Sequence, residues 1–184
     1  MKGRPRSARP SPAHRSSPSP KVRAGLHLVG SSAGLGWAGD MFVSLDHNLG
    51  SLTSILPNQP GLEGGNPAGF GYDGWNVVFR DGAANGDIHH GQPATPATLL
   101  TGEWQPDGRQ DPLASSRLPQ LDVFYGAAAN ASWHLSVADL APEGTMKLES
   151  WSLTFTGTTV PEPIGPTALV VLGLVGFAVF RRRR

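Results

Sequence analysis

The sequence contains no cysteine among its 184 residues. Disulfide bonds, thiolate metal sites and cysteine nucleophiles are therefore excluded, and the folded part must be stabilised by an apolar core. Long apolar runs are also absent before residue 164, and no earlier stretch shows a convincing helical period. Glycine and proline are abundant, at 24 and 17 residues, which favours many turns and short strands over a helical bundle.

Basic residues are scarce in the body of the chain. Residues 24–180 carry 14 acidic residues against four basic ones, a net charge of −10. Nucleic-acid binding needs a basic footprint, so this balance predicts no nucleic-acid partner. It suits an exported protein, and it also suits one that binds a hard cation through oxygen ligands.

Acidic residues are absent from the first 23 residues, which carry seven Lys or Arg together with many Ser and Pro. With almost nothing to bury, residues 1–21 are expected to be disordered. An exported protein needs a leader, but residues 24–38 are a poor one because polar residues and glycines interrupt their apolar character. We interpret this as a natural start that lies upstream; the alternative is a genuine basic tail.

A hydrolase signature is also lacking. Serine, histidine and aspartate are present, but no Gly-x-Ser-x-Gly elbow or other protease motif occurs, so the sequence predicts a protein that is not an enzyme. The histidines at 47, 89, 90 and 134 are expected in surface loops or strands. An alternative for residues 87–90 is a transition-metal site, since carboxylate and imidazole are suitable ligands.

Four aspartates lie in glycine-rich loops, where a backbone can fold around Ca²⁺ with help from carbonyl groups. They are Asp73, Asp81, Asp87 and Asp107. The alternative is that aspartate simply favours turns through its side-chain hydrogen bonds. Calcium is thus a candidate ligand, and no other cofactor is predicted.

Alternation of apolar and polar residues predicts seven or eight strands in an all-β, antiparallel two-sheet sandwich over residues 22–157. Residues 41–45 and 52–56 are predicted to form a hairpin. Other strands are expected near residues 22–28, 75–79, 99–104, 121–125, 133–137 and 151–155. The last two, with Trp133 and Trp151 in the core, are expected to be adjacent and central. Trp37 and Trp104 border loops and are the better candidates for stacking on sugar rings.

The last 27 residues combine three features. Val160, Pro161, Glu162 and Pro163 come first, then an uncharged apolar run from 164 to 180, and finally Arg181, Arg182, Arg183 and Arg184. As a helix the run would be about 25 Å long, the short end of a membrane span. The arginines would hold their end on the cytoplasmic side. This order predicts one C-terminal transmembrane helix at 164–180.

The same tail, residues 158–184, resembles the PEP-CTERM sorting signal of exopolysaccharide-producing Gram-negative bacteria. The resemblance implies recognition by an exosortase, a membrane-embedded transpeptidase-like enzyme, acting at residues 160–163. It also implies a precursor anchored in the inner membrane and a product at the cell surface or in the extracellular matrix, with exopolysaccharide as a candidate partner. The alternative is an ordinary tail anchor whose prolines keep the linker extended.

The body resembles a second family. Residues 39–45, 124–126, 131–139 and 148–155 are similar to the proprotein convertase P-domain, most clearly in the final Trp-x-Leu-x-Val and Ser-Trp-x-Leu strands. The resemblance implies a jelly-roll β-sandwich. The expected function is a non-catalytic exported surface or matrix module. The alternative is an accessory or fragmentary P-domain of a secreted subtilisin-like protease.

Overall fold

The body of the chain is built almost entirely from β-strands. The computed structural model describes residues 21–31, 36–95, 98–118, 120–142 and 144–157. Their strands are β1 (Lys21–Gly30), β2 (Met41–His47), β3 (Leu52–Asn58), β4 (Gly74–Phe79), β5 (Leu100–Trp104), β6 (Trp133–Asp139) and β7 (Met146–Thr156). Short 3-10 segments are η1 (Ala38–Asp40), η2 (Ile88–His90) and η3 (Leu121–Phe124).

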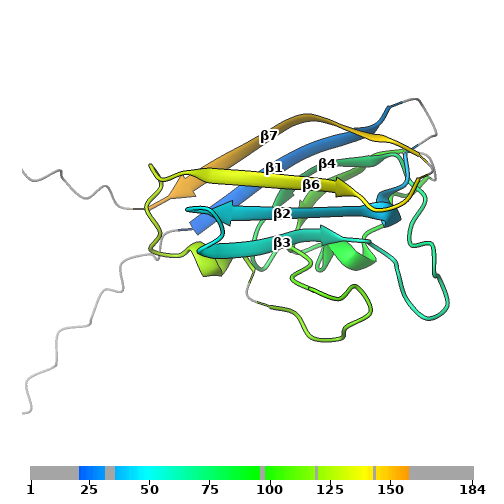
Figure 1. Ribbon diagram of the computed structural model, residues 1–184, viewed down its shortest axis with the longest axis horizontal. Coiled ribbons are helices and arrows are strands. Elements are labelled where there is room, and N and C mark those ends of the chain that lie inside the picture. The colour runs from blue at the N-terminus through cyan, green and yellow to red at the C-terminus, as the bar shows by residue number, and fades with distance from the viewer. Residues whose placement is uncertain (1–20, 32–35, 96–97, 119, 143, 158–184) are drawn as a thin grey trace, which may run out of the picture.

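The strands form two sheets (Figure 1). One has the order β5-β4-β1-β7 and the other the order β3-β2-β6. The predicted all-β, two-sheet sandwich is therefore confirmed. The prediction of purely antiparallel pairing is wrong at one place, because β4 and β5 run parallel. The long connection between these two strands, residues 80–99, lets the chain return to the same end before β5 begins.

The core lies between the inward faces of the sheets, and β1 shows how the sequence builds it. Alternate residues of β1 are buried, as the period of two requires. On the neighbouring strand β4, Trp75 stands opposite Leu28 and Val77 stands opposite Leu26. Trp75 has no exposed surface, and its indole Nε1 donates to the hydroxyl of Tyr72 at 3.0 Å. A buried indole thus keeps its hydrogen bond.

The predicted hairpin is confirmed. β2 and β3 pair antiparallel from His47 opposite Leu52 onward. The turn between them places Asn48, Leu49 and Gly50 at positive φ, the region that asparagine and glycine tolerate best. The Asn-Leu-Gly sequence therefore sets the register of this pair.

The strand predicted at 121–125 is wrong. Residues 121–124 form the 3-10 segment η3, which buries Leu121 and Phe124. Because side chains three apart share a face in a 3-10 helix, both contribute to the core. The backbone N–H of Leu121 donates to the carboxylate of Asp81 at 3.0 Å. A five-residue alternation could not distinguish this turn from a strand.

The predicted adjacency of the two C-terminal strands is also wrong. β6 pairs with β2, and β7 pairs with β1, so the two strands belong to different sheets and each forms an edge. Trp133 is half-buried, whereas Trp151 is 39% exposed and does not lie in the core. The chain crosses between the sheets after β6, and a short connection in sequence gave no sign of this.

Several predictions concern segments outside the described residues. The basic N-terminal stretch falls there up to residue 20, and so does the tail at 158–184 with its predicted membrane span at 164–180. In the part of the chain that the structure describes, no helix has the length and apolar character needed to cross a membrane.

Candidate functional site

Polar and charged side chains, most of them buried, gather where two loops meet the end of β3. We call them the buried network: Asn58, Asp87, His89, Asp107 and Arg109. Asp107 has no exposed surface, and His89 and Arg109 are 3% and 7% exposed. Two backbone hydrogen bonds to β3 hold the second loop in place, from Asp107 N to Leu56 O at 2.6 Å and from Gly108 N to Ile55 O at 3.0 Å. Charged groups are rarely buried unless paired, so the partners decide what this network does.

Asp107 is the centre of the network. Its Oδ2 accepts from the backbone N–H of Asn58 at 3.1 Å and lies 2.8 Å from Nδ1 of His89. Its Oδ1 accepts from Nη1 of Arg109 at 2.7 Å and from the Arg109 backbone N–H at 3.3 Å. Both carboxylate oxygens are therefore satisfied, which offsets the cost of burying the charge.

Arg109 is the cation that neutralises the network. Its Nη1 lies 2.7 Å from Oδ2 of Asp87 as well as 2.7 Å from Asp107, and its Nε donates to the carbonyl of Ala114 at 3.0 Å. Burial lowers the pKa of the guanidinium, but the two carboxylates outweigh it and raise the pKa above its usual value. Arg117 adds a second positive charge, with its Nε 3.5 Å from Oδ2 of Asp87.

Both ring nitrogens of His89 face acceptors. Nδ1 faces the carboxylate of Asp107, and Nε2 lies 3.3 Å from the carbonyl of Leu62. The doubly protonated imidazolium can donate to both, whereas a neutral ring leaves one nitrogen without a donor to pair with. Burial lowers the pKa of His89, but the hydrogen bond and charge of Asp107 outweigh it and raise the pKa above the ordinary value.

A hollow of about 510 Å³ lies beside the network, lined in part by Glu63, His90, Arg109 and Ser115. A histidine oriented by an aspartate supplies two of the three members of a nucleophilic triad. In this network, however, the outer nitrogen of His89 is directed at a backbone carbonyl, and its ring is almost fully buried. The arrangement fixes the imidazole without presenting it to a hydroxyl, so it is suited to holding loops together.

The four aspartates proposed for calcium do not meet at one point. Asp87 and Asp107 come together, but the guanidinium of Arg109 lies between them. Asp81 binds the Leu121 N–H and the Tyr125 hydroxyl elsewhere, and Asp73 precedes β4. Among the described residues, no group of three or more His, Asp or Glu side chains is arranged to hold a metal ion. Calcium binding stays a prediction.

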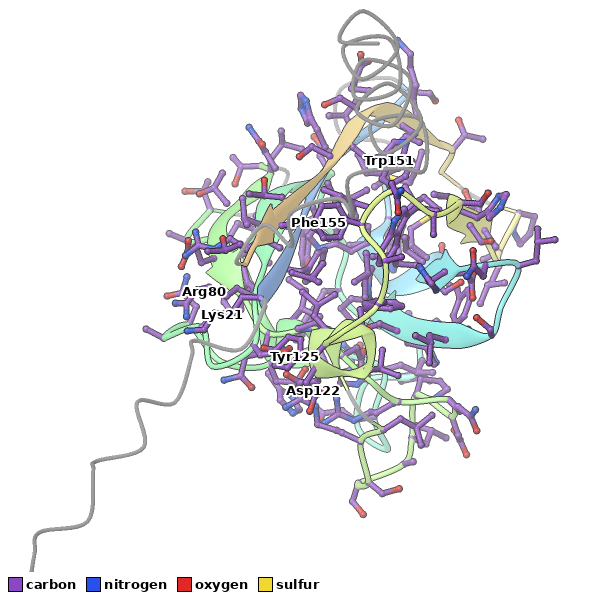
Figure 2. All side chains as sticks on the ribbon, turned by 90° about the vertical axis from the view of Figure 1, so that its left-hand side faces the viewer. Lys21, Arg80, Asp122, Tyr125, Trp151 and Phe155 are labelled. Atoms are coloured by element: carbon purple, nitrogen blue, oxygen red, sulfur yellow. The ribbon has the colours of Figure 1, made fainter. Side chains whose placement is uncertain are left out.

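Asp81 belongs to a second, more open hollow of about 680 Å³, next to η3. Asp122, Tyr125 and Arg117 also line it, and Figure 2 shows Asp122 and Tyr125 together below the sandwich. Burial raises the pKa of Asp81. Burial and the neighbouring Asp81 carboxylate raise the pKa of Tyr125 to about 12. At neutral pH the Tyr125 hydroxyl is therefore protonated and donates to Asp81.

Two histidines expected on the surface are buried instead. His89 lies in the network, and His47 is 5% exposed, with its ring edge-on to Trp133 at 4.7 Å between centroids. His90 and His134 are exposed, as predicted. The adjacent rings of His89 and His90 lie 5.3 Å apart at 85°, so they do not converge on a common ligand.

The two tryptophans proposed for sugar stacking differ in their exposure. Trp37 is 40% exposed, and its Nε1 donates to the carbonyl of Ala68 at 2.6 Å. Trp104 is half-buried at the end of β5, with its Nε1 donating to the carbonyl of Thr101 at 2.9 Å. Trp37 is thus the more exposed of the two, and sugar stacking there stays a prediction.

The predicted processing site, residues 160–163, and the arginines at 181–184 lie outside the described residues. The structure describes the chain up to Gly157, three positions before Val160. β7 ends at Thr156, so four residues separate the last strand from Pro161. Comparisons of the chain with protein-family models, with curated proteins and with solved structures found no match.

Proposed function

We propose that this protein is an exported surface or extracellular-matrix module that an exosortase processes at its C-terminal tail. One observation carries the proposal: a Val-Pro-Glu-Pro motif, an apolar run and four arginines follow the last strand in that order. Pro161 and Pro163 keep the motif extended, so its backbone is open to an enzyme. The apolar run holds the motif at the membrane, and the arginines prevent it from slipping through.

The body then serves as the cargo. It is a two-sheet sandwich that is compatible with the jelly roll of a P-domain. Its net negative charge and lack of cysteine suit a non-catalytic role outside the cytoplasmic membrane. Exopolysaccharide is the partner class that the sorting signal implies. Cleavage near residues 160–163 would free this cargo from its anchor.

The experiment compares a host with an exosortase and the same host without it. We expect the tagged protein, with a leader added upstream, to be shortened and released only where the exosortase is present. Replacing Pro161, Glu162 and Pro163 by alanine should leave the precursor in the membrane. Pro166→Ala is the matched control, since it removes a tail proline outside the motif. Equal mass and equal membrane association in both hosts would show that the tail is only an anchor.

A second function is an accessory P-domain beside a subtilisin-like catalytic domain. It is supported by the sandwich body, whose two final strands each carry one tryptophan in the motifs that resemble that family. Sequencing the genomic DNA upstream of Met1 separates the two functions. A leader alone favours the surface module, and a catalytic Asp/His/Ser domain favours the accessory role.

A further inference from the structure

Large apolar side chains are exposed along one side of the sandwich. They lie on or next to the two edge strands β6 and β7, with 36–54% of their surface exposed. We call this surface the apolar strip: Val137, Leu140, Leu148, Trp151 and Phe155. Clustered apolar exposure of this kind marks an interaction surface more often than a chance arrangement.

The strip residues on β6 and β7 are exposed although they stand opposite core residues of the neighbouring strands. On β7, Trp151 stands opposite Leu26 and Phe155 opposite Val22, and both of these β1 residues are buried. Since directly opposite residues share a face of a sheet, Trp151 and Phe155 point toward the inter-sheet space. Val137 on β6 likewise stands opposite Val43, which has no exposed surface.

The exposure therefore results from position at an edge. β7 ends the four-stranded sheet and β6 ends the three-stranded sheet. Both lie on the same side of the sandwich, uppermost in Figure 1, and their ends meet where the rings of Trp133 and Phe155 lie 5.2 Å apart. Figure 2 shows Trp151 and Phe155 following one another along β7 on that side. The sandwich is thus open along this side, and a covering element would complete its core.

We propose that the apolar run at 164–180 covers the strip when the chain is not in a bilayer. The run begins seven residues after Gly157, so it is tethered beside Phe155. Seven extended residues reach about 23–25 Å, more than enough for the chain to reverse. The run then lies antiparallel to β7, from Phe155 back to Leu148.

The lengths of the two partners match. As a helix, the 17 residues of the run measure about 25 Å. The distance along β7 from Leu148 to Phe155 is seven steps, or about 24 Å. The run has no charged residue, so covering the strip with it leaves no buried charge without a partner.

The charges at the far end also match. A run that returns along β7 brings Arg181–Arg184 to the end of the sandwich where β6 finishes. Asp139 is exposed there as the last residue of β6. Glu149 lies on β7 next to Leu148, paired with Lys147 at 2.7 Å. The arginines would thus stay in water beside carboxylates.

The absence of cysteine makes this arrangement directly testable. In full-length protein kept dilute and free of lipid, we introduce cysteine pairs and oxidise them. The matched pairs are Phe155→Cys with Gly165→Cys, and Leu148→Cys with Val179→Cys. The crossed pairs, Phe155→Cys with Val179→Cys and Leu148→Cys with Gly165→Cys, are the controls. Peptide mass spectrometry identifies intramolecular disulfides, and non-reducing gels identify dimers.

We expect intramolecular disulfides in the matched pairs and at least tenfold less in the crossed pairs. Disulfides between molecules alone would assign the strip to a second copy of the chain and overturn the proposal. Equal yields in all four pairs, or none, would overturn it as well. These results do not depend on exosortase processing, so this proposal and the sorting proposal can fail separately.

A second measurement keeps the strand residues intact. Leu172→Arg places a charge in the middle of the run and should release it from the strip. We expect this full-length variant to bind the dye anilinonaphthalene sulfonate several times more strongly than the unmodified protein. Unchanged dye fluorescence would show that the run does not cover the strip.

Discussion

At the scale of single residues, Asp107 is the side chain that links the loops around the end of β3 to one another. It joins Asn58 at the end of β3, His89 in η2 and Arg109 in a loop. Removing one member of such a buried ionic group lowers the free energy of unfolding by about 3–5 kcal/mol, because the remaining charges lose their partners. The network therefore holds long loops that have little regular structure of their own.

The raised pKa of His89 gives the network a pH dependence. Because the folded state favours the protonated ring, its stabilising contribution is complete below the unfolded pKa of about 6.5. It is lost as the pH rises through the higher folded pKa. We therefore expect the free energy of unfolding, measured in urea, to fall as the pH rises above the unfolded pKa of about 6.5.

Two variants assign this dependence to a residue. His89→Gln should flatten the pH profile, since the amide does not titrate. His134→Gln is the matched control, because His134 is an exposed residue of β6, and this variant should leave the network's contribution in place. If His89→Gln keeps the profile of the unmodified protein, the titration belongs to another group.

At the scale of elements, the start of β4 depends on Gly74. Its φ is +120°, and a Cβ at this position would lie 2.1 Å from the carbonyl oxygen of Leu28 on β1. We expect Gly74→Ala to destabilise the fold by roughly 2–4 kcal/mol, from backbone strain and overpacking together. Gly64→Ala is the control, since nothing lies within 4 Å of its added methyl group. Thermal unfolding of the two variants side by side tests this, and equal melting temperatures would contradict it.

The sequence predicted elements better than it predicted their partners. Alternation identified β2, β6 and β7 because each strand has one apolar and one polar phase. It could not assign β6 and β7 to different sheets, because alternation is the same in both sheets. The exposure of Trp151 follows from the edge position of β7, so the sequence pattern could not predict it either. The turn at η3 was missed because four residues are too few to separate a period of two from a period of three.

The buried network was missed for a different reason. Several of its hydrogen bonds join residues that are 18 to 51 positions apart in the sequence, and no local pattern connects such residues. One signal was available. The body has only four basic residues, and Arg109 and Arg117 both lie close to Asp107 in sequence. In a chain with few basic residues, an arginine close to an aspartate in sequence favours an ion pair over a metal site at that aspartate.

At the scale of the whole molecule, the charge is divided unevenly, and the net charge of −10 over residues 24–180 motivates a test of calcium binding. If loop aspartates bind Ca²⁺ in the folded state, millimolar Ca²⁺ raises the melting temperature by mass action and a chelator reverses the rise. Mg²⁺ at equal concentration is the control for general screening of negative charge. An equal response to both ions, or no response, would remove the hypothesis.

The pairing of β1 with both β4 and β7 has a consequence for the order of folding. The first described strand is central in its sheet, and one of its two neighbours is the last strand, with Lys21 opposite Thr156. When the chain emerges N-terminus first, one edge of β1 therefore stays unpaired until almost the whole body has appeared. Contacts of such long sequence separation form slowly. During synthesis or export, the half-formed sheet thus exposes an unpaired edge, and the final strand completes the domain just before the apolar run follows.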